Sequence, residues 1–222
     1  MRLPQNLLFD LDGTILDSLP GIEYSVRSAF GACQLRMREE DLRRIIGPPI
    51  RTILSAAGDI SDSETLDALE LEFRKSYDSE GWQRTVCFPS AHKVLKTIRR
   101  IGHRLFIVSN KPRHISLRIL EREGMLNLFD SIVTADSRTP RFRDKAEMLC
   151  SVMTEYNMNQ DQCMFVGDTM EDADAAAAAG MGFVYMTHGY GEPVEAATVP
   201  IAYAFDSFSQ MLLLVTPEPV CD

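Results

Sequence analysis

The chain has 222 residues, a length that suits one large domain or one domain carrying a smaller insertion. Its composition, 45% hydrophobic and 25% charged, is ordinary for a globular protein, and no apolar stretch reaches the ~18–20 residues that cross a bilayer. The formal net charge of −9 argues against nucleic acid or an anionic membrane as a partner, and an anionic substrate would need a metal ion or placed basic groups.

Short apolar runs, each bounded by polar residues or glycine, alternate with segments of helical period. Runs of this kind are typical of strands that are buried on both faces. The expected strands lie at 6–10, 104–110, 131–136, 163–168 and 182–187, and the expected helices at about 90–101, 113–123, 144–156 and 170–179. This alternation predicts an α/β fold, a parallel sheet flanked by helices on both faces.

The segment between 17 and 86 breaks this alternation. Its apolar residues have a helical period in four places and give no clear strand. We therefore expect a core domain formed by residues 1–15 and 86–222, with a helical cap domain at 16–85 inserted after the first strand. The expected cap helices lie near 17–32, 38–46, 49–57 and 62–80.

Cysteine usage bears on the compartment. The five cysteines are scattered and include no C-x-x-C pair, which argues against a disulfide framework and a zinc site. The N-terminus "MRLPQNLLFD" does not read as a signal peptide. Together these features predict reduced thiols in a cytoplasmic protein.

Polar side chains stand where three of the expected strands end. Asp10 and Asp12 follow the first strand, Ser109 and Asn110 end the second, and Asp168 follows the fourth. Because ligands bind outside the carboxyl ends of parallel strands, we expect these groups to share one crevice. Two close carboxylates raise each other's pKa, and a divalent cation such as Mg²⁺ removes that conflict.

Each acid also has a structural interpretation. Asp-Gly is a common turn pair, and Asp168, Glu171 and Asp172 would suit a helix N-terminus. Asp172 lies about one helical turn beyond Asp168, so it could face the same metal ion or orient its waters. Asp17, followed by Ser18, is expected to begin the first cap helix rather than to act in catalysis.

Four motifs in this order resemble those of the haloacid dehalogenase superfamily. "FDLDGTILDS" is similar to its first motif, D-x-D-G-[TV], and "FIVSNKP" is similar to its second. Lys145 in "RDKAEML" stands where the third motif has its lysine, and "FVGDTMEDADAAAAAG" is similar to the fourth, G-D-x-x-x-D. The resemblance covers residues 6 to 180 and implies a Rossmann-like core, with the helical insertion as a C1-type cap.

Further stretches are similar to the phosphoglycolate phosphatase branch of that superfamily. These are "IGPP", "SNKP", "GDTxxD" and "HGYG". "CFPSA" and "DKAEML" depart from the branch's usual pattern, so nucleotides, pyrophosphate and sugar phosphates stay open as substrates beside a phosphoglycolate-like metabolite.

The resemblance implies a Mg²⁺-dependent phosphatase that acts on a small phosphorylated metabolite. Asp10 would attack phosphorus and form an aspartyl-phosphate, and Asp12 would act as general acid and base. Asp10, Asp168 and the main-chain carbonyl of Asp12 would hold the metal, with Asp172 bound to it or to its waters.

The resemblance also implies a set of phosphate-binding groups. Ser109 and the Asn110 main chain would bind the phosphoryl oxygens, and Gly13 and Thr14 would shape a loop that faces them. Lys145 would hold the phosphate and Asp10.

Three other basic side chains and one histidine are further candidates for the site. Lys111, Arg141 and Arg143 are rivals of Lys145, which is preferred because it opens the helix leading to the "CMFVGD" strand. His188 is left out of the catalytic set, because the aspartate pair already fills the acid–base role.

The insertion would act as a lid that excludes water and supplies specificity. Gly47, Pro48 and Arg51 are the candidates for the cap edge that meets substrate. A simple helix–helix turn is an equally good interpretation for Arg51.

Several alternatives remain open at this point. A receiver-type binding module also accepts a phosphoryl group with clustered acids and a lysine on a parallel sheet. The length of the chain, its insertion and Asp12 favour the enzyme. A phosphomutase, a nucleotidase and a pyrophosphatase would use the same core. As partners we expect the small substrate alone, with the chain a monomer or a homodimer.

Overall fold

The core of the molecule is a parallel sheet, seen in a computed structural model that describes residues 3–38, 42, 45–46, 48–190 and 200–214. The strands follow the order β5-β4-β1-β6-β7-β8. They are β1 (Asn6–Phe9), β4 (Arg104–Ser109), β5 (Ser131–Thr134), β6 (Cys163–Gly167), β7 (Gly182–Met186) and β8 (Tyr203–Phe205). The expected α/β fold with a Rossmann-like parallel sheet is confirmed.

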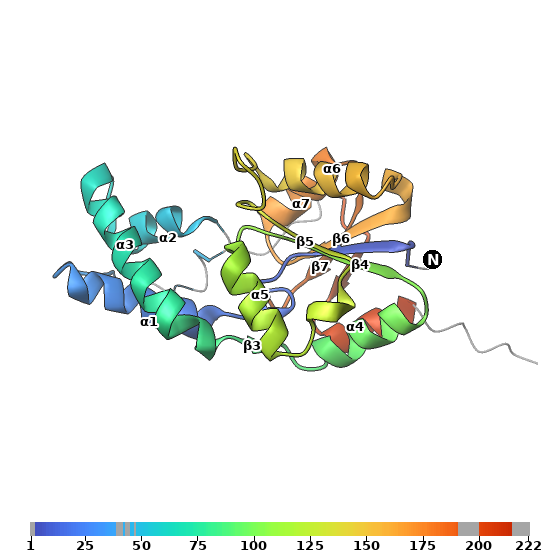
Figure 1. The fold of residues 1–222 in the computed structure, drawn as a ribbon, viewed down its shortest axis with the longest axis horizontal. Helices are drawn as coiled ribbons and strands as arrows, with labels where there is room; N and C mark the ends of the chain where they lie inside the picture. The colour runs from blue at the N-terminus through green and yellow to red at the C-terminus, as the bar shows by residue number, and fades with distance from the viewer. Residues whose placement is uncertain (1–2, 39–41, 43–44, 47, 191–199, 215–222) are drawn as a thin grey trace, which may run out of the picture.

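Helices cover both faces of this sheet (Figure 1). They are α4 (Ala91–Arg100), α5 (Arg113–Arg122), α6 (Lys145–Glu155) and α7 (Met170–Ala178). Buried residues of α4 and α5 belong to one apolar cluster, and those of α6 and α7 to another. Within the described part of the chain, every helix is too short or too polar to cross a bilayer.

Strand β1 runs through the middle of the sheet, between β4 and β6. Its side chains point alternately to the two faces, as the pleat of a strand requires. Leu7 and Phe9 pack in the cluster beneath α4 and α5, whereas Leu8 packs in the cluster beneath α6 and α7. Because both faces are covered, the strand is apolar throughout and ends where the first acid begins.

The expected strands and helices of the core agree with the structure, with small differences at their ends. No pattern in the sequence predicted β8, which has three residues at the edge of the sheet, or the 3-10 helix that follows it at Phe208–Leu214. Phe208 and Met211 of that helix are buried in the cluster shared with α4.

Three further helices gather beyond the end at which β1 stops (Figure 1). They are α1 (Leu19–Ala32), α2 (Ile50–Gly58) and α3 (Ser63–Ser79). The buried positions Ile22, Val26, Ala29 and Phe30 form an apolar stripe on α1, the helix that packs along α3. Part of the expected helix at 38–46 lies outside the described residues. Gly47 also lies outside them.

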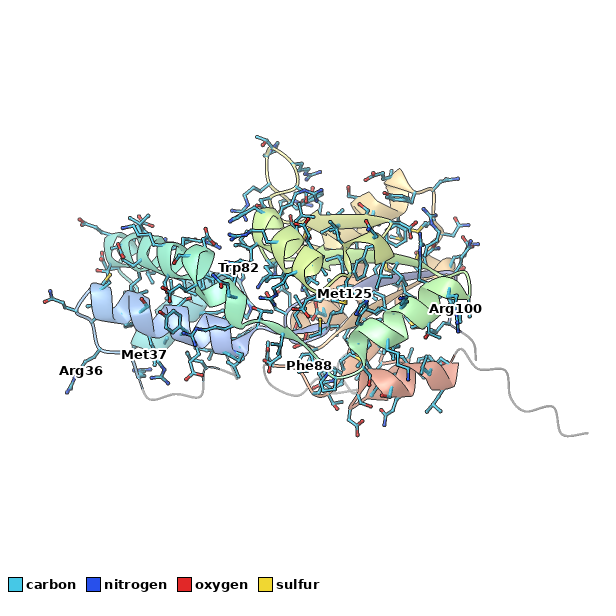
Figure 2. All side chains as sticks on the ribbon, turned by 60° about the horizontal axis from the view of Figure 1, so that its bottom comes forward. Arg36, Met37, Trp82, Phe88, Arg100 and Met125 are labelled. Atoms are coloured by element: carbon cyan, nitrogen blue, oxygen red, sulfur yellow. The ribbon has the colours of Figure 1, made fainter. Side chains whose placement is uncertain are left out.

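Two short strands that the sequence did not predict connect these helices to the sheet region. β2 (Leu16–Asp17) pairs antiparallel with β3 (Val86–Cys87), so the chain leaves and re-enters at one place. Figure 2 shows Trp82 and Phe88 on either side of this re-entry. The guanidinium of Arg118, on α5, lies 4.1 Å from the centroid of the Trp82 ring.

The start of α1 differs from the expectation. Ser18 precedes the helix, but its hydroxyl makes no capping hydrogen bond. Instead the Tyr190 hydroxyl accepts a hydrogen bond from the Leu19 N–H at 2.9 Å and donates to Asp17 Oδ1 at 2.6 Å. Asp17 therefore supports the helix start through a tyrosine distant in sequence.

Two glycines of α1 allow a matched test of its packing. A Cβ at Gly21 would lie 2.2 Å from the Gly81 carbonyl oxygen, whereas a Cβ at Gly31 would meet nothing within 4 Å. We expect Gly21→Ala to lower the free energy of unfolding by about 1–3 kcal/mol, because backbone must shift. Gly31→Ala should raise it by up to about 1 kcal/mol. Urea denaturation measures both, and equal effects would contradict this packing.

Candidate active site

The order of the strands brings the polar strand ends together. Because β1 lies between β4 and β6, the residues after these three strands are neighbours. Asp10, Asp12, Ser109, Asn110 and Lys111 line one pocket with Lys145, Thr169 and Asp172. The crevice expected at this edge of the sheet is therefore present, and it has a cavity of about 80 Å³.

Three buried carboxyl groups gather at the floor of the site, where Asp10 and Asp172 line the pocket and Asp168 lies beside them. Asp10, Asp168 and Asp172 each offer one oxygen, and these oxygens lie within 4.8 Å of one another. Burial raises the pKa of Asp10 to about 7, with Lys145 acting in the opposite direction. Burial, together with the charges of Asp172 and Asp10, also holds the pKa of Asp168 well above its usual range. Such a cluster is costly to keep ionised without a cation.

Lys145 supplies a fixed positive charge among these acids. Its ammonium group donates to Asp10 Oδ1 at 3.0 Å and to Asp172 Oδ1 at 2.5 Å. Burial by itself would lower the pKa of Lys145, but the Asp10 and Asp172 carboxylates raise it above its ordinary value. The rivals Arg141 and Arg143 are exposed, so among these three residues the lysine is the one that reaches the acids.

The start of α6 explains why Lys145 is so well placed. Asp144 caps the helix by accepting a hydrogen bond from the Glu147 N–H, so the helix begins at Lys145. The lysine is therefore held by a rigid first turn, and its long side chain reaches the end of β1. This position agrees with the preference for Lys145 as the residue that opens a helix.

Asp172 has one of the two roles that the sequence left open, that of a helix N-terminal acid, and it also contacts Lys145. It forms a capping box with Thr169 at the start of α7. Its Oδ2 accepts from the N–H groups of Asp168 and Thr169, at 3.2 and 3.1 Å, while Oδ1 accepts from Lys145. Asp172 thus fixes the start of the helix and the position of the lysine at once.

The loop after β1 holds Asp168 in place. The Thr14 hydroxyl donates to Asp168 Oδ1 at 2.7 Å, and the Tyr190 N–H donates to Oδ2 at 2.8 Å. Gly13 has φ +87°, and a Cβ there would lie 2.0 Å from Asp168 Oδ2, so only glycine fits.

The amides of Gly13 and Thr14 are used within the same loop. The N–H groups of Gly13 and Thr14 donate to the carbonyl oxygens of Leu16 and Leu11 within the loop. These two N–H groups close the turn. They are hydrogen-bonded within the loop because the loop is tight. In the structure, Gly13 and Thr14 contact the acids and the loop itself.

Asp12 stands apart from the three buried acids. Its side chain is 20% exposed at the pocket, and the Lys111 ammonium donates to its Oδ1 and Oδ2 at 2.9 and 3.1 Å. The same ammonium donates to the Tyr77 hydroxyl at 2.7 Å. The sequence presents Lys111 only as a rival of Lys145. It does not indicate Tyr77, because nothing in the sequence connects α3 with the end of β1.

The remaining candidates lie in different places. Ser109 is buried at the pocket, and the Asn110 side chain donates to Glu171 Oε1 at 2.9 Å. Arg51 does not join them: its guanidinium donates to Asp67 and Ser63 on α3, and it is not among the described residues that line the pocket. Pro48 lines the pocket, and Gly47 lies outside the described residues.

The wall opposite the acids is mostly apolar. It is formed by Ile22, Ile46, Pro48, Pro49, Ile50, Ile53 and Phe73, with the polar side chains of Arg74 and Tyr77. The pocket therefore joins a polar, charged floor from the sheet to an apolar wall from the helical segment. A ligand with an anionic end and a small apolar body matches this division.

Comparison with known proteins bears on the class to which this site belongs. A family described as haloacid dehalogenase-like hydrolase matches residues 7–186 of the chain. A phosphoglycolate phosphatase of Pasteurella multocida is 29% identical over 216 residues, which are 93% of this chain and 96% of that protein. Another, of Cereibacter sphaeroides, is 32% identical over 83% of this chain and 85% of its own.

Two further similarities complete the comparison. The tyrosine-protein kinase PtkA of Mycobacterium tuberculosis is 32% identical over 85% of this chain, which spans 64% of that protein. A haloacid dehalogenase-like hydrolase of Streptococcus pneumoniae shares the fold, with a TM-score of 0.87 at 20% identity over 96% of this chain and 99% of its own. The chain belongs to the haloacid dehalogenase-like hydrolases. Within that family it stands with the phosphatases, in the branch that contains the phosphoglycolate phosphatases.

Removing the positive charge of Lys145 should make the free energy of unfolding depend strongly on pH. The pKa of Asp10, about 7, lies above its ordinary value of 3.8, so the folded protein binds the extra proton and loses stability as pH rises between these values. Lys145→Met raises that pKa further, because Asp10 and Asp172 lose their partner. We expect a loss of about 3–5 kcal/mol near pH 8 and a smaller loss near pH 5.5.

Urea denaturation in the presence of EDTA at both pH values measures this effect. Lys93→Met on the exposed face of α4 is the matched control, and it should change little at either pH. A loss for Lys145→Met that does not depend on pH would contradict the account of the buried acids.

Proposed function

We propose that the protein is a Mg²⁺-dependent phosphatase that hydrolyses a small phosphorylated metabolite through an aspartyl-phosphate on Asp10. The observation that carries this proposal is the buried Asp10 carboxylate at the floor of the pocket, held at 3.0 Å by the Lys145 ammonium. The contact fixes the carboxylate and keeps positive charge where a phosphoryl group would sit. A carboxylate is a workable nucleophile that divides a difficult hydrolysis into two easier steps.

The two steps assign distinct tasks to the first two acids. In the first, an Asp10 oxygen bonds to phosphorus as the ester P–O bond breaks, and Asp12 gives its proton to the leaving oxygen. In the second, Asp12 takes a proton from water, whose oxygen bonds to phosphorus as the bond to Asp10 breaks. Inorganic phosphate leaves and the Asp10 carboxylate is restored. The partly exposed Asp12, at the side of the pocket that the leaving group would occupy, supports this division.

The donor set of the floor suits Mg²⁺. Asp10, Asp168 and Asp172 provide hard oxygen atoms close together, with more negative charge than one lysine offsets. Asp10 and Asp168 would hold the ion together with the Asp12 main-chain carbonyl, and Asp172, occupied by Lys145 and α7, would orient them. When bound, the ion supplies charge neutralisation for the phosphoryl oxygens. Thr14 and the Tyr190 N–H keep Asp168 turned toward the site.

The helical segment 16–85 is proposed to act as a cap over a core formed by 1–15 and 86–222. The pairing of β2 with β3 supports this, because both crossings between the two parts run side by side. Helices α1, α2 and α3 contribute the apolar wall opposite the acids. A cytoplasmic location is supported by the free thiols of Cys33, Cys87, Cys150 and Cys163.

The substrate is proposed to be a phosphoglycolate-like metabolite. The relatives described above bear two different names, phosphoglycolate phosphatase and tyrosine-protein kinase, and the shape and lining of the pocket favour the former. A cavity of about 80 Å³ favours a small leaving group, and its apolar wall offers few partners for the hydroxyl groups of a sugar. Arg74 on α3 is suited to a carboxylate.

The contacts of Arg74 support this use. Its guanidinium is 3.5 Å from Glu70 Oε1, but Glu70 also lies 3.7 Å from Arg51. One carboxylate shared by two guanidinium groups leaves Arg74 able to bind a further anion. Arg74 would thus bind the second negative charge of the substrate while the floor binds the first.

Asp10→Asn tests the reaction itself. With 4-nitrophenyl phosphate and Mg²⁺ we expect turnover by the native chain, loss of turnover with EDTA, and a fall of more than about a thousandfold for the variant, because the nucleophile is gone. Asp174→Asn, at an exposed position of α7, is the control and should keep its activity. Activity that survives Asp10→Asn would overturn the proposal.

Arg74→Gln tests the recognition of the substrate. We expect KM for 2-phosphoglycolate to rise by roughly tenfold or more, the loss of one charged hydrogen bond, with little change for 4-nitrophenyl phosphate. Lys75→Gln, at the next and exposed position of α3, should alter neither value. If both substrates lose equally, Arg74 does not bind a carboxylate.

A further inference from the structure

A chain of three polar groups connects helix α3 with Asp12. The Tyr77 hydroxyl lies 2.7 Å from the Lys111 ammonium, which lies 2.9 and 3.1 Å from the two Asp12 oxygens. Tyr77 is on α3, Lys111 follows β4 and Asp12 follows β1. Three segments far apart in the sequence therefore meet through one ammonium group.

The burial of Lys111 makes these contacts necessary. Its side chain is 3% exposed, and an ammonium group is costly to bury unless its donors are satisfied. Asp12 provides the opposite charge, and Tyr77 provides a hydroxyl acceptor, with its ring centroid 4.9 Å from the ammonium. Loss of either partner would leave the lysine free to take another rotamer.

The packing of α3 sets the position of the Tyr77 hydroxyl. The ring is buried and stacks on Phe73 at a centroid distance of 5.3 Å, and the hydroxyl lies 3.5 Å from Thr85 Oγ1. The tyrosine is thus rigid with respect to its own helix. Any displacement of α3 from the sheet would withdraw the hydroxyl from Lys111.

We propose that Tyr77 and Lys111 are positioning residues that couple the docking of α3 to the placement of the Asp12 carboxyl group. With α3 in place, Tyr77 fixes Lys111 and Lys111 fixes Asp12 at the pocket. With α3 displaced, Asp12 is free to rotate, and proton delivery to the leaving oxygen is lost. The inference rests on the proposed function, in which Asp12 is the general acid.

Two aryl phosphates of similar shape separate this role from mere packing. Phenol, with a pKa near ~10 like that of tyrosine, leaves poorly without a proton, whereas 4-nitrophenol is a better leaving group and needs protonation less. For Tyr77→Phe we expect kcat/KM for phenyl phosphate, which reports the step that releases the phenol, to fall by on the order of tenfold, while that for 4-nitrophenyl phosphate changes by less than about twofold. Hydrolysis of the aspartyl-phosphate is common to the two esters, so any effect on Asp12 as a base lowers kcat for both alike.

Tyr24→Phe is the matched control. Its hydroxyl is also hydrogen-bonded to a charged side chain, donating to Glu80 Oε2 at 2.7 Å, but it stands on α1 and is not among the described residues that line the pocket. This variant should leave the ratio of the two rates unchanged. Urea denaturation of each variant shows whether folding has been altered.

Lys111→Met and the double variant complete the test. Lys111→Met should show the same selective loss on phenyl phosphate, and adding Tyr77→Phe to it should cost nothing further, because Tyr77 acts through the lysine. Equal losses of kcat/KM on both esters, or additive losses of kcat/KM in the double variant, would overturn the inference. Absence of Mg²⁺-dependent turnover in the native chain would instead remove the proposed function.

Discussion

The structure depends on the burial of three carboxyl groups where β1 and β6 end. Asp10, Asp168 and Asp172 lie within reach of one another in the interior, where ionised groups are costly. Lys145 offsets part of that cost through contacts with two of the three acids. Much of the surrounding architecture, including the capped starts of α6 and α7, keeps this arrangement from relaxing.

The acids are held by groups that also build the fold. Asp172 caps α7 and anchors Lys145, and the Tyr190 hydroxyl and N–H bond respectively to the start of α1 and to Asp168. Asp172 and Tyr190 therefore each connect the start of a helix to the buried acids of the candidate site. Such sharing explains why the site can be rigid although its members come from the two ends of the chain. Substitution of these residues is therefore expected to change both the candidate site and the free energy of unfolding.

The pocket divides its work between two parts of the molecule. The sheet contributes charged groups that suit phosphoryl transfer, and the helices α1, α2 and α3 contribute an apolar wall with Arg74 and Tyr77. A phosphatase core can thus be combined with pocket walls of different composition, since the two surfaces lie on different segments. The Tyr77–Lys111–Asp12 contacts are the place where the two parts meet.

The sequence by itself determined the α/β alternation, the helices between residues 17 and 86, and the acids that follow β1 and β6, because apolar period and strand-end position are local signals. It also pointed to Lys145, through its place at a helix start. Tertiary structure alone decided that Lys111 pairs with Asp12, that Tyr77 joins them, and that Arg51 turns toward α3. Those contacts depend on how helices pack across the sheet edge, and a side chain's partner at a distance leaves no periodic trace in the sequence.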